Sequence, residues 1–155
     1  MSSELRELYQ EVILDHGRTP RNFHKPEGAN HHANGHNPLC GDRVTVHLKL
    51  KDDKVEDVGF EGSGCAISMA STSLMTEVLK GKTVTEAHAL FHRFHDLLTG
   101  SEDSAGDAAV DTDDFERLMV LAGVREYPMR VKCATLGWHT MEAAIGTEAD
   151  KVSTE

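Results

Sequence analysis

The chain contains 155 residues, of which 39% are hydrophobic and 27% are charged, a composition typical of one globular domain. Because 26 acidic residues outnumber 16 lysines and arginines, the net charge of −10 argues against nucleic acid or anionic lipid as a partner. The sequence has neither an apolar run of about 20 residues, as a membrane span needs, nor the start of a secretory signal. We therefore expect a cytoplasmic protein, in which three cysteines favour a metal or reactive-thiol site over disulfides.

The first half of the chain predicts one helix followed by a small antiparallel sheet. Apolar residues recur at helical spacing near the N-terminus until Gly17 ends the pattern. Residues 18–37 are rich in Gly, Asn, His and Pro, which indicates a loop with room for one irregular strand. Residues 43–50 alternate apolar and polar side chains, as do residues 55–61 after a polar turn, so these two segments predict a hairpin.

The second half predicts a series of helices. The first begins at Cys65 and the second opens with a capping box formed by Thr83 and Glu86. We expect the apolar stripe of the first of these helices to consist of four residues: Ile67, Ala70, Leu74 and Val78. A short helix at about 114–122 and a final helix from about Cys133 follow. Residues 1–146 are therefore expected to form one α+β domain, with helices on one face of the sheet, and residues 147–155 a frayed tail.

An acidic segment lies between the second and third cysteines. Residues 96–116 contain eight acidic side chains and no lysine or arginine. We expect the centre of this insert, about residues 99–112, to be mobile. A solvated loop is one interpretation, and a docking surface for a basic patch on a partner protein is the alternative.

The three cysteines lie far apart in the sequence, so only the fold can assemble them into one site. Cys65 and Cys133 each lie where a predicted helix begins, a position that stabilises a thiolate. Cys40 lies in a turn-rich loop, and Asp42 follows two residues later. Three thiolates and a carboxylate make a tetrahedral ligand set for zinc, or ligands for an iron–sulfur cluster. The alternative is that the cysteines are buried as small hydrophobic residues.

Four ordered segments resemble the NifU/IscU N-terminal superfamily of iron–sulfur cluster assembly proteins. They are LYQEVILDH at 8–16, NPLCGD at 37–42, GSGCAIS at 62–68 and RVKCATL at 130–136. Two features are similar to the SufU branch rather than to the IscU branch. Lys132 precedes the third cysteine, where IscU-type proteins carry a histidine, and the Leu-Pro-Pro-Val-Lys chaperone motif of IscU is absent. The acidic insert is also similar to that of SufU proteins.

The resemblance implies an IscU/SufU-like fold and a Zn2+ site formed by Cys40, Asp42, Cys65 and Cys133. It also implies that Cys40 accepts persulfide sulfur from a SUF-type cysteine desulfurase after zinc ligand exchange, with a downstream SUF scaffold complex as a further partner. We expect no independent catalysis, because the cofactor of the desulfurase would break the carbon–sulfur bond. One alternative is an IscU-like scaffold that assembles a [2Fe-2S] cluster on the same residues, and another is a purely structural zinc domain.

Histidines offer further candidate ligands. His88, His92 and His95 share one face of a predicted helix, but they lie opposite its apolar stripe and lack the glutamate of an HExxH motif. We expect a solvated polar face there. Three other histidines precede Cys40 and are expected to belong to a polar loop: His31, His32 and His36.

Overall fold

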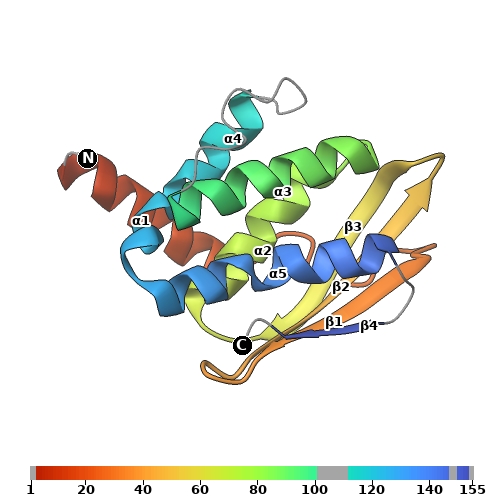
Figure 1. The fold of residues 1–155 in the computed structure, drawn as a ribbon, viewed down its shortest axis with the longest axis horizontal. Coiled ribbons are helices and arrows are strands. Elements are labelled where there is room, and N and C mark those ends of the chain that lie inside the picture. The colour runs from red at the N-terminus through yellow and green to blue at the C-terminus, as the bar shows by residue number, and fades with distance from the viewer. Residues whose placement is uncertain (1–2, 101–111, 147–149, 154–155) are drawn as a thin grey trace.

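A computed structural model describes residues 3–100, 112–146 and 150–153 (Figure 1). The expected mobility of the acidic insert concerns mainly residues 101–111, which lie outside the described residues. The helices are α1 (Ser3–Arg18), α2 (Ala66–Leu79), α3 (Val84–Thr99), α4 (Thr112–Leu118), the 3-10 helix η1 (Met119–Glu126) and α5 (Pro128–Gly146). The strands are β1 (His31–Asn37), β2 (Asp42–Lys51), β3 (Lys54–Ser63) and β4 (Asp150–Ser153).

The strands form one sheet in the order β3-β2-β1-β4, in which the pairs β1–β2 and β2–β3 are antiparallel. The apolar residues of β2 that alternate in the sequence are buried, which confirms the predicted hairpin of β2 and β3. Where the sequence suggests a frayed tail, β4 instead pairs parallel with β1. Such a pairing depends on backbone hydrogen bonds from a distant segment, which side-chain periodicity does not reveal.

The strand β1 lies in a segment that the sequence indicates to be mainly loop. It has no alternating apolar pattern, because the residues on its buried face include Ala33 and Gly35 rather than large side chains. These residues are small because α5 crosses β1 closely. A Cβ atom added to Gly35 would lie 2.0 Å from the Oγ1 atom of Thr140 in α5. The position of β1 is therefore determined by its packing against α5, and its residues have little β propensity of their own.

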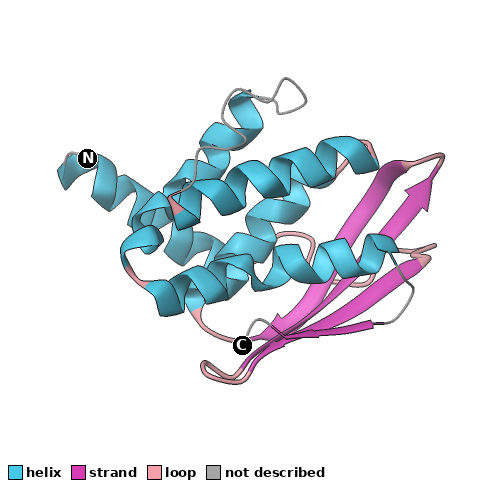
Figure 2. Ribbon diagram, viewed as in Figure 1, coloured by secondary structure: helices cyan, strands magenta, loops and turns pink. Residues whose placement is uncertain are grey.

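The helices form a layer on one face of the sheet, as Figure 2 shows, and this confirms the predicted α+β class. The helices α2 and α5 pack directly on the strands, while α1 and α3 contact α2 and α5 from outside. In the described part of the chain, no helix combines the length and the apolar character needed to cross a bilayer.

The helix α2 is buried on nearly all sides. The single apolar stripe expected for it is too narrow, because serines and threonines on its other faces are buried as well. Most of its buried hydroxyls have protein partners, although Ser68 Oγ is buried without a hydrogen bond. Trp138 Nε1 donates a hydrogen bond of 3.3 Å to Ser71 Oγ, and Ser71 Oγ donates to the carbonyl of Ala134. Because buried hydroxyls that are hydrogen-bonded avoid the desolvation penalty, serines and threonines can line an interior helix face. Cys65 directly precedes this helix as its N-cap.

Candidate metal centre

Cys40 and Asp42 are placed by the tight turn that joins β1 to β2. Asn37 shapes this turn, because its Oδ1 atom accepts a hydrogen bond from Leu39 N at 3.2 Å and its carbonyl accepts one from Cys40 N at 3.3 Å. Gly41 then adopts a left-handed backbone with φ of +72°, which favours glycine. The turn leaves Cys40 partly exposed and brings Asp42, the first residue of β2, into a fully buried position.

Cys65 is the N-cap of α2, so its predicted position at the start of a helix is confirmed. Its Sγ atom accepts a hydrogen bond of 3.5 Å from Ser68 N. It is also tied to Asp42, since Cys65 N donates to Asp42 Oδ1 at 2.8 Å and the Sγ atom lies 3.8 Å from Asp42 Oδ2. The chain passes close to this carboxylate, because a Cβ atom added to Gly64 would lie 2.4 Å from Asp42 Oδ1.

Cys133 differs from its predicted position at a helix start. The helix α5 already begins at Pro128, a favoured first residue of helices, so Cys133 lies more than one turn inside it. Its side chain is fully buried, and its Sγ atom lies 3.3 Å from that of Cys40. The expected stabilisation of a thiolate by the helix N-terminus therefore does not apply to Cys133.

The structure brings together the side chains that the sequence predicts as ligands. Within the described residues, the donor atoms of Cys40, Asp42 and Cys133 all lie within 4.8 Å of one another. Cys65 adjoins this group through its contact with Asp42. Three donors thus meet where the β1–β2 turn approaches the second turn of α5, and the start of α2 brings Cys65 against one of them, Asp42.

Burial makes the charged forms of these side chains costly unless a cation pairs with them. Burial raises the pKa of the Cys133 thiol far above its ordinary value, and the adjacent Cys40 and Cys65 side chains raise it further. The carboxylate of Asp42 is also completely buried. Buried anionic groups are stabilised by pairing with a cation or by binding a metal. Sulfur and carboxylate ligands suit zinc, so the residues present fit this ion.

Asn37 is a supporting residue that sequence reasoning did not identify. It is fully buried, and its Nδ2 atom donates a weak hydrogen bond of 3.9 Å to Cys133 Sγ while its carbonyl and Oδ1 atoms shape the Cys40 turn. A side chain that orients two ligands in this way acts as an outer-shell partner of a metal site. The Asn-Pro dipeptide at residues 37 and 38 is a turn signal, but it does not indicate contact with a distant cysteine.

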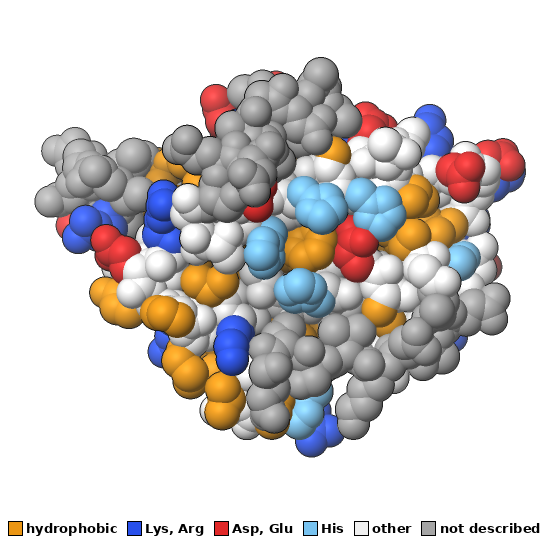
Figure 3. Space-filling model, in the orientation of Figure 1, with side chains coloured by type: hydrophobic (Ala, Val, Ile, Leu, Met, Phe, Trp, Pro, Cys, Tyr) orange, Lys and Arg blue, Asp and Glu red, His pale blue; other side chains and the backbone are white. Residues whose placement is uncertain are grey.

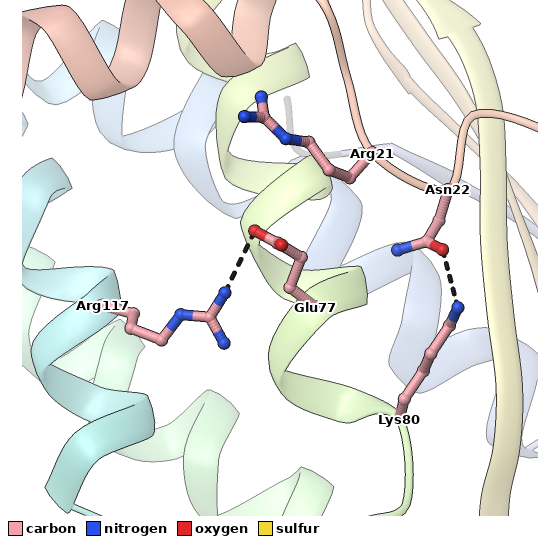
Figure 4. A pocket seen from close by; sticks show the side chains of 5 residues that line it. All are labelled: Arg21, Asn22, Glu77, Lys80 and Arg117. Atoms are coloured by element: carbon pink, nitrogen blue, oxygen red, sulfur yellow. Dashed lines mark hydrogen bonds and ion pairs between the residues drawn. The ribbon is translucent and has the colours of Figure 1, made fainter.

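A separate pocket lies at the other end of α2. It is lined by Arg21, Asn22, Glu77, Lys80 and Arg117, as Figure 4 shows. Its cationic groups already have partners, since Arg117 pairs with Glu77 at 3.1 Å and Lys80 Nζ donates to Asn22 Oδ1 at 2.7 Å. The cationic side chains of this pocket are therefore engaged with neighbouring residues, since Arg21 also pairs with Asp15.

The fold and the donor set define a small α+β protein with a cysteine-rich centre suited to a metal ion. The family of the NifU-like N terminal domain matches residues 8–134. A protein of Bacillus subtilis named zinc-dependent sulfurtransferase SufU is 41% identical over 95% of both chains. An iron–sulfur cluster assembly scaffold protein IscU of Streptococcus pyogenes is 36% identical over 96% of this chain and 89% of that protein.

A solved structure agrees with these sequence matches. The crystal structure of a putative iron–sulfur cluster assembly scaffold protein for the SUF system from Fervidobacterium islandicum superposes with a TM-score of 0.79 and 37% identity. The match covers 93% of this chain and 99% of that chain. The chain belongs to the NifU-like N-terminal domain family, as the four sequence segments predict.

Proposed function

We propose that this protein accepts sulfur from a SUF-type cysteine desulfurase in cytoplasmic iron–sulfur cluster assembly and depends on zinc to do so. The observation that carries this proposal is the approach of the Cys40, Asp42 and Cys133 donor atoms to within 4.8 Å, with Cys65 against Asp42. The similarity to a SufU named as a zinc-dependent sulfurtransferase supports it. These four side chains would hold the zinc ion.

Zinc bound here would keep the thiols deprotonated and, having no redox chemistry of its own, would leave them reduced. Among the three thiols, Cys40 is the one we assign as sulfur acceptor. It lies in a surface turn next to Leu39, whose side chain is 55% exposed, whereas Cys133 is buried inside a helix. A partner protein can therefore approach Cys40 with little change in the surrounding fold.

The transfer step is a thiol exchange at Cys40. Its thiolate attacks the outer sulfur of the persulfide on the desulfurase, and a new sulfur–sulfur bond forms at Cys40. The sulfur–sulfur bond on the desulfurase breaks, and the desulfurase cysteine leaves as a thiolate with the electron pair. No external oxidant or reductant is needed. The Cys40 persulfide would then be passed to a downstream SUF scaffold complex.

A second candidate function is that of a scaffold for a [2Fe-2S] cluster on the same residues. The 36% identity with an IscU scaffold favours it. The lysine at position 132, where IscU-type proteins carry a histidine, favours sulfur transfer instead. Metal analysis and absorption spectra of protein purified without oxygen distinguish the two. Sulfur transfer predicts one zinc per chain without visible absorption, whereas a scaffold predicts equal amounts of iron and sulfide.

Replacing the acceptor tests the proposal directly. We expect Cys40→Ala to remain folded and to reduce the stimulation of desulfurase turnover to the level measured without this protein. Mass spectrometry should find an added sulfur on Cys40 of the parent protein after incubation with desulfurase and cysteine. Ser63→Ala, an exposed substitution near Cys65 that keeps all four donors, is the matched control and should stimulate like the parent.

Two results would contradict this assignment. If Cys40→Ala stimulates the desulfurase as strongly as the parent, Cys40 is not the acceptor. If Cys40→Ala unfolds and the parent never carries a persulfide, a purely structural zinc domain explains the centre better.

A further inference from the structure

A second cluster of metal-ligating side chains lies on the surface where α3 and α5 meet. Figure 3 shows histidine side chains gathered around a hydrophobic side chain, with an acidic side chain beside them. In the structure, three histidine rings lie around the ring of Phe91, which is buried. Its centroid lies 6.1 Å from that of His92, 6.0 Å from that of His95 and 5.0 Å from that of His139.

This cluster differs from the solvated histidine face that the sequence predicts for α3. His88 Nδ1 lies 2.6 Å from Glu142 Oε1 on α5, and His95 and His88 are only partly exposed. The helix α5 contributes His139, a residue that helical periodicity within α3 cannot reveal. The tertiary packing thus adds a ligand from a second helix to the row of histidines on α3.

The geometry suits a shared ion. The ring centroids of His95 and His139 lie 6.1 Å apart. Two imidazoles that bind one zinc ion at about 2.1 Å have ring centroids about 5 to 6.5 Å apart. His92 lies one turn before His95 on α3 and is exposed, so its side chain can leave its stacked position on Phe91 and rotate toward the same point.

We propose that His92, His95 and His139 form a second site for a divalent transition-metal ion that prefers imidazole ligands, such as Zn2+. This site is separate from the thiol centre. In the described part of the chain, only the Cys40 group already has three donor atoms within 4.8 Å of one another. The histidine site therefore forms by rotation of His92 and His95 when the ion binds.

The surroundings support binding of a cation. His139 lies on α5 and is only partly exposed, so an ion bound to its ring would be partly shielded from solvent. Glu142 lies one turn after His139 and adds a negative charge next to the site. Three neutral nitrogen ligands bind zinc less tightly than the thiolate set, so this second ion should exchange more readily.

Calorimetric titration of Zn2+ tests this site in the full chain, after the metal already present has been measured. We expect one additional equivalent of Zn2+, with shifts of the His92, His95 and His139 ring signals in NMR spectra. The double variant His95→Ala/His139→Ala should lose this equivalent while keeping the original metal content. His24→Ala removes an exposed histidine outside the cluster and should bind like the parent.

Because His139 is partly buried, a variant of the exposed ligand provides a second test. His92→Ala should weaken the additional binding by at least about tenfold without loss of the fold. The proposal is wrong if no additional equivalent binds, if it persists in the double variant, or if only histidines outside the cluster shift. Metal content at the thiol centre is measured separately, so this outcome is independent of the proposed sulfur transfer.

Discussion

Two glycines help to place the ligand Asp42, one through its backbone conformation and one through close approach. Gly41 adopts the left-handed backbone between Cys40 and Asp42, although a Cβ atom added to it would meet nothing within 4 Å. Gly64 lies against the carboxylate itself, so a side chain at this position would push Asp42 or Cys65 away. The positions of the donor atoms thus depend on residues that contribute no ligand.

We expect Gly64→Ala to lower zinc content and to reduce the free energy of unfolding by about 1 to 3 kcal/mol, because the added methyl group overlaps Asp42 Oδ1. Metal analysis and urea unfolding measure the two effects. Gly123→Ala is the control, since a Cβ atom at this position meets open space. Equal zinc content and stability in Gly64→Ala and the parent would show that Asp42 tolerates displacement.

Among the elements, α3 has the most complete N-terminal signal. Thr83 Oγ1 accepts a hydrogen bond of 3.1 Å from Glu86 N, and Thr83 N donates one of 2.9 Å to Glu86 Oε1. These bonds confirm the predicted capping box. They fix the start of α3, the helix that carries His92 and His95. They make no contact with the thiol centre.

Thr83→Ala should therefore destabilise the protein without affecting the thiol centre. We expect a loss of about 1 kcal/mol in the free energy of unfolding, as is usual when an N-cap side chain is removed. Chemical denaturation measures this loss, and zinc content should stay at the parent value. Thr85→Ala, in the exposed first turn of α3, should change the stability by only a few tenths of a kcal/mol. A comparable loss in both variants would contradict the capping role.

For the whole molecule, His16 links stability to pH. Its ring is buried, with Nδ1 lying 2.8 Å from Ser73 Oγ and Nε2 lying 3.6 Å from Glu77 Oε1. Burial, followed by the positive charge of Arg21, lowers the pKa of His16 below its ordinary value of 6.5. The unfolded chain therefore binds this proton more readily than the folded chain, and the folded state loses stability as the pH falls below 6.5.

We expect His16→Gln to make the free energy of unfolding less dependent on pH between about 7.5 and about 5.5, the range in which histidine titrates. Urea unfolding at both pH values measures the difference. His24→Gln, at an exposed position, should keep the pH dependence of the parent. If His16→Gln loses as much stability on acidification as the parent, protonation of His16 is not the cause.

The sequence alone determined the elements with strong local signals. The alternation in β2 and β3, the capping box of α3 and the N-cap position of Cys65 depend on neighbouring residues, so spacing revealed them. Local patterns did not reveal β1, which lacks large apolar residues, or the depth of Cys133 within α5. Both depend on which element packs against them.

Only the tertiary structure decided which side chains meet. Cys40, Asp42 and Cys133 approach each other because a hairpin turn lies against the second turn of α5, and His95 meets His139 because α3 packs beside that same helix. Contacts between distant segments follow from the burial of whole faces of helices and sheets. Their free energy is shared among many residues, so no short stretch of sequence encodes them.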